Sequence, residues 1–580
     1  MSGFWQRLQQ RKLVQWAVAY VAFAFALIQV ADVVADSYHW PDGVMHLLFS
    51  LLALGFIVAL LLAWYHGERG AQRANGTELV ILMVLLSVGG VLIWRLAPDV
   101  AAPAAVPVTH ADTAPHAIRS IAVLPLANDS GDHAEDYFTE GMTDQLTTDL
   151  AIISKLRVIS HSSTMQFMST SRPPAPEIAR LLDVDAVVEG SVLRVRDKVR
   201  ITAQLIDARA DKVLWAKSYE RDARDVLALQ DAMASAIAEE INVRLTPDEH
   251  ARLTSVKAVI PAAYDAYLKG RYFFNRPSDE NLRKAITQFE QAINLDPDFA
   301  PAYSGLSDTY MSDGYNETDY TAAQAKGNAE AAAEQAIRLD DNSAEAHTSL
   351  AVFRCYYDQD WAGSEKEFRR AIALNPNYAY AHNQLGGMLS CLGRNAESIE
   401  QSQLAARLDP LSPQVLLDAV GALAWQGNLA QARQLIARAA ELDPNFSYVP
   451  WIAGWIDIEA SRPGDAIPAL RRAASLQAPP FVTAWLGYAY AASDDRTHAL
   501  ATLDALKKYS LHGYVAPFNL AVIYLGLGDH ERAPTYLEQA YVADSQWLVW
   551  LRSDRIFDPL RKEPRFIALM DKLGFKGSRP

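Results

Sequence analysis

The sequence is poor in the residues that build a covalent framework or a nucleic-acid-binding surface. Its 580 residues include two cysteines, too few for a network of disulfides. Lys and Arg number 53 against 68 Asp and Glu, so the formal net charge is −15. Because nucleic-acid binding needs a basic footprint, this composition argues against nucleic acid as a partner.

Motifs of the common cofactor- and metal-dependent enzymes are missing as well. The sequence contains no GxxxxGK[ST], no GxGxxG and no HExxH. We therefore predict no catalytic residue, no cofactor and no metal, and we expect a protein that is not an enzyme. Four acidic residues could still ligate a metal or act as acid and base, although capping and solvation of a helix start also explain them, and we favour that interpretation. They are Asp129, Asp132, Glu135 and Asp136.

Long apolar runs, by contrast, are present in the first 100 residues, at 13–34, 44–64 and 79–96. Each approaches the roughly 20 residues that a helix needs to cross about 30 Å of hydrocarbon. Basic residues lie before the first run and between the second and third. Residues 1–12 are therefore predicted to be cytoplasmic, and the bulk of the chain is predicted to lie on the opposite side of the membrane. Residues 13–97 are thus predicted to form three transmembrane helices. Residues 98–117, rich in Ala and Pro, are predicted to be a tether.

Short apolar runs alternate with helical patterns between residues 118 and 246, which predicts an α/β domain. Asp132 with Glu135 three residues later is typical of a helix start. Buried strands are predicted at 120–126, 156–160, 186–196, 199–207 and 212–220, and helices at 177–182 and 222–245.

A pattern repeats every 34 residues in the second half of the chain. Pro376, Pro410 and Pro444 are 34 residues apart, and each follows an Asn or Asp. Small alanines recur on the helix before each proline, which resembles the tetratricopeptide repeat (TPR). We predict eight repeats from 261 to 544, stacked as an all-α solenoid, with 545–580 as a capping segment and a polar loop at 312–321.

A second resemblance covers the α/β region. The stretches IAVLPLANDSGD, YFTEGMTDQLTTDL and VRITAQLIDA are similar to the TolB-amino-terminal-like domain, which precedes TPR repeats in many bacterial proteins. The ending RIFDPLRKEPRFIALMDKLGF is also similar to that group, whose members are often labelled adenylate-cyclase-like or CadC-like regulators. Some relatives carry a cyclase, kinase or winged-helix domain on the cytoplasmic side. Only twelve residues precede the first apolar run here, so we expect none of these domains.

The predicted fold class is therefore multidomain: three transmembrane α-helices, an α/β (TolB-N-like) domain and an all-α TPR solenoid. The resemblance implies a bacterial inner-membrane protein whose soluble parts are periplasmic. In TPR proteins, first-helix positions on the concave surface contact partner peptides. Aromatic residues there would be anchors if exposed, or would pack against neighbouring helices if buried. The corresponding positions here are Phe353, Tyr356, Tyr380, Asn383, Tyr448, Trp451 and Trp455.

Two further pairs of residues leave alternatives open. Cys355 and Cys391 lie in neighbouring repeats and could form a disulfide, although stacked helices about 8–10 Å apart are usually too distant for one. His347 and His382 lie at neighbouring helix starts and could bind a metal. Without another ligand at suitable spacing, we expect surface histidines.

These features predict a non-enzymatic scaffold or adaptor, anchored in the inner membrane, that binds protein or peptide partners through the TPR groove and the α/β domain. One alternative is a transmembrane signalling receptor that acts through a separate cytoplasmic output protein. Another is an enzyme activity in the α/β domain.

Overall fold

The computed structural model of the protein describes residues 117–168, 172–253, 259–276, 278–316, 322–476 and 479–575, together with Tyr20, Val21, Ala24, Ile28, Leu52 and Phe56. The chain divides into two compact units, Met1–Pro115 and His116–Pro580. In the first unit the six described residues are helical, and the Tyr20 hydroxyl donates a hydrogen bond of 2.9 Å to the Leu52 carbonyl oxygen.

The prediction of three transmembrane helices, and with it the inner-membrane location, is corrected by the structure. Among the described residues no helix is both long enough and apolar enough to cross a bilayer. The longest, α13 (Ala322–Leu339), has 18 residues and carries charged side chains along its length. The apolar run of α22 (Pro480–Ala492) has 13 residues, the length of a buried core helix and too short for a span. Most of the predicted segments 13–34, 44–64 and 79–96, and the tether, lie outside the described residues.

The second unit begins with a six-stranded sheet in the order β3-β1-β4-β5-β6, with β2 paired to β4. The strands β1, β2, β3 and β4 pair in parallel, whereas β4, β5 and β6 form antiparallel pairs. The strands predicted from the sequence are confirmed to within a few residues. Their bounds are β1 Ser120–Val123, β2 Ala127–Asn128, β3 Arg157–Val158, β4 Ala186–Val195, β5 Lys198–Asp207 and β6 Lys212–Asp222.

Helices cover both faces of the sheet. On one face α5 (Asp136–Ala151) and α8 (Val226–Glu240) bury a continuous apolar core with β1, β4 and β5. On the other face α7 (Ala175–Leu182) packs against the opposite side chains of β1 and β4. The short helices α6 (His161–Thr164), η2 (Met165–Phe167) and α9 (Pro247–Leu253) complete this region.

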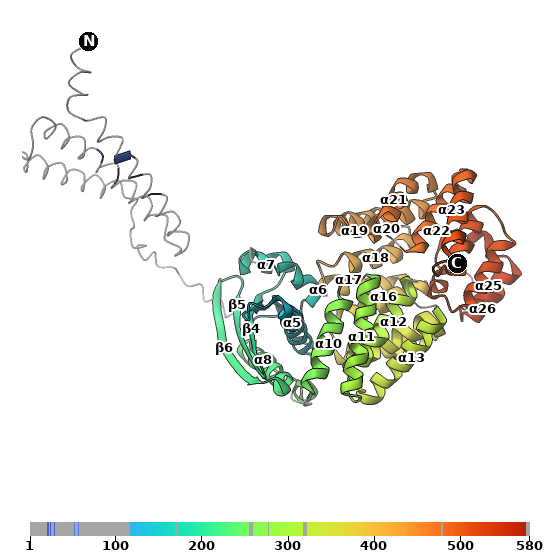
Figure 1. Ribbon diagram of the computed structural model, residues 1–580. Helices are drawn as coiled ribbons and strands as arrows, with labels where there is room; N and C mark the ends of the chain where they lie inside the picture. The colour runs from blue at the N-terminus through green and yellow to red at the C-terminus, as the bar shows by residue number, and fades with distance from the viewer. Residues whose placement is uncertain are drawn as a thin grey trace, which may run out of the picture. The chain divides into compact units, whose positions relative to one another are not determined.

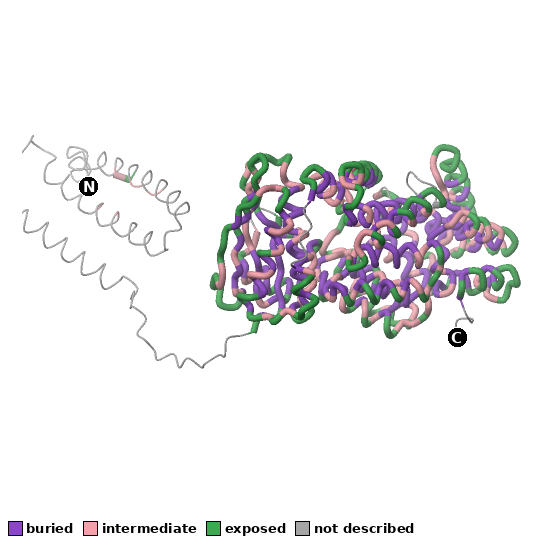
Figure 2. Tube along the Cα trace, turned by 90° about the horizontal axis from the view of Figure 1, so that it is seen from below, coloured by how far each residue is buried: buried purple, intermediate pink, exposed green. Residues whose placement is uncertain are grey.

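Eight helix pairs follow, and Figure 1 shows them stacked side by side beyond the sheet. Buried alanines such as Ala405, Ala439 and Ala473 allow close packing, and Figure 2 shows the buried positions running through the interior of the stack. Residues 312–316 extend α12, so the predicted loop at 312–321 is wrong over that part. The pairs are α10 Pro261–Phe274 with α11 Asp279–Leu295, α12 Ala300–Asn316 with α13, α14 Ala344–Phe353 with α15 Trp361–Leu374, α16 Ala379–Cys391 with α17 Asn395–Leu408, α18 Pro413–Trp425 with α19 Leu429–Leu442, α20 Tyr448–Glu459 with α21 Pro463–Ser475, α22 with α23 Arg496–Tyr509, and α24 Pro517–Gly526 with α25 Arg532–Val542.

The α/β region is held against the turns between repeats by buried hydrogen bonds. The Asn377 side-chain amide donates to the carbonyl oxygens of Ala151 and Leu156, at 2.9 and 2.8 Å, with a longer contact of 3.4 Å to that of Ile153. Its side-chain oxygen accepts from the Val158 N–H at 3.1 Å. Asn377 therefore satisfies backbone groups at the end of α5 and the start of β3 that the sheet leaves unpaired.

The next turn forms an equivalent contact one repeat later. The Asp409 carboxylate accepts hydrogen bonds from the hydroxyls of Ser162 and Ser163, both at 2.5 Å. Leu411, 5% exposed, packs into the apolar cluster that α7 forms with the sheet. Polar and apolar contacts on two successive turns thus fix the α/β region along one rim of the solenoid.

We predict that Asn377→Ala destabilises the protein, because the variant leaves several buried backbone groups without partners. The expected loss in the free energy of unfolding is about 2–4 kcal/mol. Denaturant unfolding of the full chain, followed by far-UV circular dichroism, would measure it. Asn445 occupies the same place after Pro444 but is exposed, so Asn445→Ala is the matched control and should change stability little. Equal effects of the two substitutions would contradict the proposed role of Asn377.

Candidate functional site

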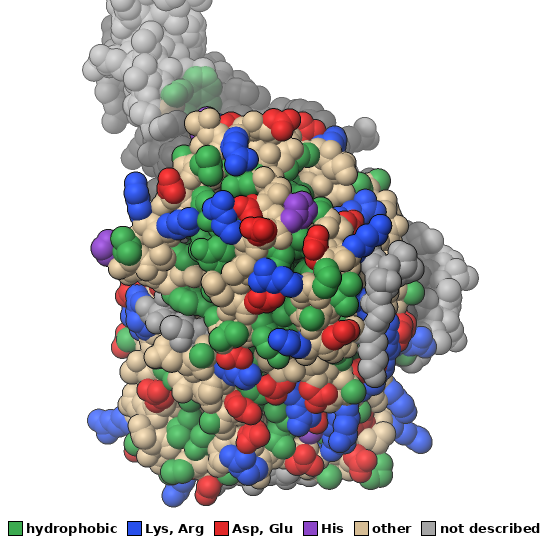
Figure 3. Space-filling model, turned by 90° about the vertical axis from the view of Figure 1, so that its right-hand side faces the viewer, with side chains coloured by type: hydrophobic (Ala, Val, Ile, Leu, Met, Phe, Trp, Pro, Cys, Tyr) green, Lys and Arg blue, Asp and Glu red, His purple; other side chains and the backbone are tan. Residues whose placement is uncertain are grey.

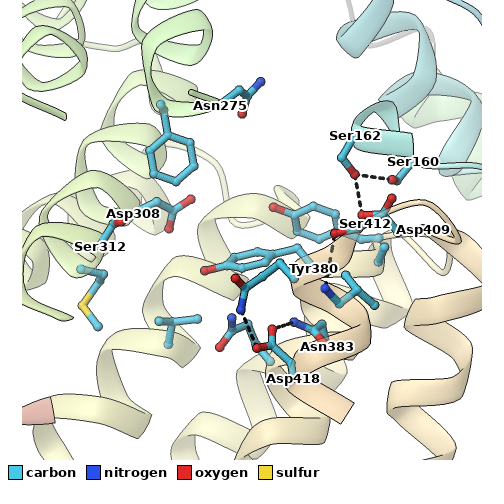
Figure 4. A pocket seen from close by; sticks show the side chains of 18 of the residues that line it. Ser160, Ser162, Asn275, Asp308, Ser312, Tyr380, Asn383, Asp409, Ser412 and Asp418 are labelled. Carbon is cyan, nitrogen blue, oxygen red and sulfur yellow. Dashed lines mark hydrogen bonds between the residues drawn. The ribbon is translucent and has the colours of Figure 1, made fainter. Parts of the chain in front are cut away.

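A large cavity lies between the α/β region and the first helices of the repeats. Its volume is about 2450 Å³, and its walls come from α5 and α6 on one side and from α10, α12, α14, α16, α18 and α20 on the other. Figure 4 shows side chains from several of these helices pointing toward one another across it. The cavity is the concave face of the repeats, closed on one side by the α/β region.

Polar side chains follow the concave face from one repeat to the next. The Ser349 hydroxyl on α14 donates to the Asp308 carboxylate on α12 at 2.7 Å. The Asn383 amide on α16 donates to the Asp418 carboxylate on α18 at 2.6 Å, and Gln414 donates to the other oxygen of Asp418. These hydrogen bonds join neighbouring first helices and hold the two carboxylates in place.

The surroundings in the cavity shift the ionisation of these acids, of which Asp308 is buried and Asp418 is exposed. Desolvation raises the pKa of Asp308 to about 6 and that of Asp418 to about 6, although each accepts side-chain hydrogen bonds that oppose the shift. Tyr380 lies between them in Figure 4, and both carboxylates help to raise its pKa after the larger effect of burial. Both carboxylates therefore act electrostatically on Tyr380.

Two of the four arginines that line the cavity pair with acids of the α/β region. Arg271 forms an ion pair of 3.1 Å with Asp144, and Arg276 one of 2.7 Å with Glu140. Both acids belong to α5, whereas both arginines belong to the first repeat, so the pairs also fasten the two regions together.

The C-terminal segment forms the opposite wall. After the last repeat the chain continues through η5 (Gln546–Trp550), η6 (Arg555–Leu560) and α26 (Pro564–Lys572), and it lies against the concave side of earlier repeats. Gln546 donates to the Met311 carbonyl oxygen at 3.1 Å and to the Tyr357 hydroxyl at 2.8 Å. The segment thus returns to the second and third repeats.

Further contacts fix the rest of this segment. The Trp455 indole N–H donates to Asp554 at 3.0 Å, and the Ser553 hydroxyl donates to the Ser390 carbonyl oxygen at 3.0 Å. The Trp361 indole N–H donates to the Leu573 carbonyl oxygen at 3.0 Å. Residues 546–573 therefore contact earlier repeats, and four of them, Gln546, Trp547, Trp550 and Asp554, line the cavity.

The seven residues predicted to form the groove are distributed unequally. Phe353 is 1% exposed and belongs to the core between repeats. Trp451 and Trp455 are buried beneath the C-terminal segment, where the Trp451 and Trp547 ring centroids are 6.0 Å apart. Tyr356 and Tyr448 are half-buried and Asn383 is buried, whereas Tyr380 is 36% exposed. All of them except Phe353 line the cavity.

The histidines do not lie on the surface, and that prediction is wrong. His347 and His382 are 4% and 3% exposed, and each joins its helix to the preceding turn through a backbone carbonyl oxygen. Cys355 and Cys391 are free and buried, and burial raises both pKa values.

The acidic group near residue 130 has structural partners. Asp132 caps a helical turn by accepting from the Ala134 N–H at 2.9 Å, as the sequence predicts. Asp136 accepts from the Asn128 amide at 2.8 Å. Glu135 pairs with Arg194 at 3.3 Å. Among the described residues, no group of three or more His, Cys, Asp or Glu side chains is placed to hold a metal ion.

The sequence analysis missed Asp308, Asp418 and the tryptophans of the C-terminal segment. A periodic signal was available only for their hydrogen-bond partners, because Ser349 and Asn383 are 34 residues apart, whereas Asp418 lies one residue beyond the next equivalent position. The greater length of the second repeat shifts Asp308 out of this register. Residues such as Trp547 gave no signal, since nothing in the repeat pattern indicates that the chain turns back into its own groove.

Comparison with known proteins supports the repeats. The sequence model of the tetratricopeptide repeat family matches residues 518–545, which contain most of α24 and all of α25. A curated protein of Rhizobium meliloti (strain 1021) named "Putative adenylate cyclase 3" is 34% identical over 236 residues. The match covers 40% of this chain and 40% of that protein, so less than half of either is aligned.

Solved structures show a partial likeness. A thermophilic TPR protein of Thermus thermophilus is 18% identical with a TM-score of 0.28, over 32% of this chain and 95% of that one. The Cut9–Hcn1 assembly of the APC/C is 15% identical with a TM-score of 0.37, over 59% of this chain and 62% of that one.

A buried carboxyl pair makes the docking of the C-terminal segment sensitive to pH. Burial and the neighbouring Asp554 raise the pKa of Glu459 to about 9, so folded Glu459 holds its proton at neutral pH. The folded state then binds more protons than the unfolded state between the ordinary pKa of 4.5 and about 9. Stability from this group is complete below that window and is lost as pH rises through it.

We therefore predict that Glu459→Gln removes much of this pH dependence. The parent should lose roughly 2–4 kcal/mol of unfolding free energy between about pH 5 and about pH 8 through this group, and the variant should not. Urea unfolding at a series of pH values would measure the difference. Glu400→Gln is the control, because it removes a solvent-exposed carboxylate from the surface of α17. A variant whose pH profile follows that of the parent would exclude this role for Glu459.

Proposed function

We propose that the protein is a non-enzymatic scaffold whose cavity holds a segment of a partner protein. The observation that carries the proposal is the cavity of about 2450 Å³ on the concave face of the TPR repeats. The matched TPR family and the repeat pattern support protein–protein interaction as the general role. Tyr380, exposed in the wall, is the predicted contact that the C-terminal segment leaves most accessible.

The remaining predicted contacts have different parts in this proposal. Tyr356, Asn383 and Tyr448 line the cavity and are proposed to contact the partner directly. Trp451 and Trp455 line its far end, where the C-terminal segment also packs. Phe353 is proposed to support these contacts from within the core, since its side chain is buried between helices.

The α/β region is proposed to complete the site. Its sequence resembles the TolB-amino-terminal-like domain, and its helix α5 supplies one wall of the cavity. The hydrogen bonds of Asn377 hold this wall at a fixed place relative to the repeats. Selectivity for a partner would then come from both regions together.

The cavity offers a position for blocking the proposed site. Gly387 on α16 lines the cavity, and a Cβ atom built there meets no atom within 4 Å. Gly387→Trp should therefore place a large side chain in the cavity beside Tyr380 and Asn383 without a clash at its Cβ atom. Gly327 on α13 is equally open but does not line the cavity, so Gly327→Trp is the matched control.

We predict that a photo-crosslinking amino acid in place of Tyr380 captures a partner protein in cells. Capture should fall about tenfold or more in the background of Gly387→Trp and persist with Gly327→Trp. Quantitative mass spectrometry of the crosslinked products would measure both. The same crosslinker in place of Leu511, 75% exposed and outside the cavity, gives the background. Capture that is unchanged by Gly387→Trp would place the contact elsewhere.

A further inference from the structure

The two edges of the sheet differ in length and in what lies beside them. At one edge β3 has two residues, and the Asn377 side chain accepts from its Val158 N–H at 3.1 Å. At the other edge β6 has 11 residues with neither proline nor glycine, and β5 is its one neighbour in the sheet that the structure describes. Figure 1 shows β6 as the outermost strand, on the side of the α/β region away from the repeats. A long edge of this kind presents backbone groups that can pair with a further strand.

The opposite end of this unit offers a partner side chains rather than backbone. Figure 3 shows acidic and basic side chains intermixed there with hydrophobic ones. The last repeats at that end are helices, whose N–H and C=O groups are bonded within the helix along most of their length. The long open strand edge of the described chain is therefore that of β6.

The alternation of hydrogen bonds along β6 determines which of its backbone groups face outward. The Ala223 N–H donates to the Asp197 carbonyl oxygen at 2.7 Å, in line with the antiparallel pairing of β5 and β6. Hydrogen-bonded and non-hydrogen-bonded pairs alternate in such a ladder, so the odd-numbered residues from 215 to 221 bond to β5. The even-numbered residues direct their N–H and C=O groups away from β5. They are Ala216, Ser218 and Glu220.

These outward-facing groups are accessible. The residues Ala216, Ser218 and Glu220 are all exposed. The Glu220 carbonyl oxygen accepts from the Arg221 guanidinium at 2.9 Å, as expected of a group that points away from β5. On the same strand the Val213 side chain is 48% exposed. The edge thus presents both backbone groups and apolar surface to its surroundings.

A second copy of β6 can pair with the first in few registers. Outward-facing residues must oppose one another, so a twofold axis has to lie near the middle of the stretch, at one of the positions 216–220. An axis at Lys217 puts two lysines opposite each other, and an axis at Glu220 does the same with two glutamates. An axis at Tyr219 puts Lys217 opposite Arg221. Like charges directly opposite each other are destabilising, so these three registers are disfavoured.

The two remaining registers differ in how they meet a β-bulge. Leu214 lies between residues of β6 that pair with β5 and has no counterpart there. An axis at Ala216 would place Leu214 opposite Ser218, so the new ladder would run across the bulge, where pairing is disrupted. An axis at Ser218 keeps the ladder within the regular part of the strand. The Ala216 backbone then bonds to that of Glu220 in the other copy, and the two Ser218 residues bond to each other.

The side chains in the register centred on Ser218 are complementary as well. Lys217 of one copy lies opposite Tyr219 of the other, and Trp215 lies opposite Arg221. Within one chain the Lys217 ammonium already lies 5.0 Å from the centre of the Tyr219 ring. Each of these cross-strand pairs joins a cation to an aromatic ring, which is an attractive contact. No like charges are directly opposite each other in this register.

We propose that the protein forms a symmetric dimer by antiparallel pairing of β6 with β6 of a second copy, about a twofold axis at Ser218. The sheet then continues from one copy into the other. Among the described residues that line the cavity none belongs to β6, so both cavities stay open. The inference goes beyond the proposed function and does not depend on it.

Cysteine crosslinking tests the register. Ser218→Cys in the full-length protein places two thiols across the axis, where the Cα atoms of a hydrogen-bonded pair are about 5.5 Å apart and a disulfide can form. We expect oxidation with copper phenanthroline to convert most of this variant to a disulfide-linked dimer on a non-reducing gel. Ala216→Cys is the matched control, because its two thiols lie about 13 Å apart along the strands. The parent is a second control, since Cys355 and Cys391 are buried.

Proline at the axis tests the backbone hydrogen bonds. The Ser218 N–H points away from β5, so Ser218→Pro removes no bond within the sheet, and an edge strand tolerates proline at such a position. We expect this variant to raise the dissociation constant of the dimer at least tenfold. Ser218→Ala keeps the N–H and should dimerise like the parent. Sedimentation equilibrium of the full-length chain measures each constant, and circular dichroism verifies that each variant is folded.

A change of charge tests the same register without altering the backbone. Ala216→Glu places a carboxylate opposite Glu220 of the other copy and should weaken the dimer about fivefold or more. Ala216→Lys places an ammonium there, and its dimer should be at least as tight as that of the parent. These two variants decide the question if Ser218→Pro does not fold.

Four outcomes would overturn the inference. Three of them are a monomeric parent, an Ala216→Cys variant that crosslinks as readily as Ser218→Cys, and equal dimerisation of the Ala216→Glu and Ala216→Lys variants. The fourth is a Ser218→Cys chain that crosslinks in cells to a different protein and not to itself, which would assign the edge to another partner. Partner capture from Tyr380 is expected to persist in each case, so failure of the dimer would leave the proposed function intact.

Discussion

The hydrogen bonds that Asn377 makes with the backbone of the α/β region are the interaction on which the architecture of the site depends. They pair carbonyl oxygens at the end of α5 with the turn between the third and fourth repeats. A solenoid alone presents an open concave surface, whereas this contact places α5 opposite that surface and makes it one wall of a cavity. Asp409 and Leu411 extend the same attachment to the next turn. The position of the α/β region is therefore fixed by specific polar contacts at two turns as well as by apolar burial.

The interior of the solenoid is divided by polarity. At one end carboxylates and tyrosines from the first helices face the α/β region, and at the other end tryptophans pack against the returning C-terminal segment. A buried indole N–H without an acceptor is costly, so the end lined by tryptophans is not at its energetic optimum with the groups that the described chain supplies.

Much of the fold could be predicted from the sequence, and the reasons for the failures are physical. The period of 34 and the buried alanines identify the helix pairs, because close packing of neighbouring repeats needs small residues at fixed positions. The strands were predictable from apolar runs bounded by polar turns. The transmembrane prediction relied on hydrophobic length, on the placement of basic residues and on the family resemblance. Positions on the concave face could be listed from the repeat, but their exposure could not, since Trp451 and Trp455 are covered by a segment about one hundred residues away in the chain.

The return of the C-terminal segment to the second and third repeats changes how the array should respond to stress. In an open solenoid each repeat contacts its neighbours alone, so terminal repeats can fray independently. Here Gln546 and Trp361 connect the last part of the chain to repeats near its beginning, across more than two hundred residues of sequence. The C-terminal segment thus closes the array by contacts with early repeats, so unfolding of one end of the array breaks contacts at the other end. Unfolding should then be cooperative over all the repeats, and a partner bound to the concave face would meet a rigid, preformed surface.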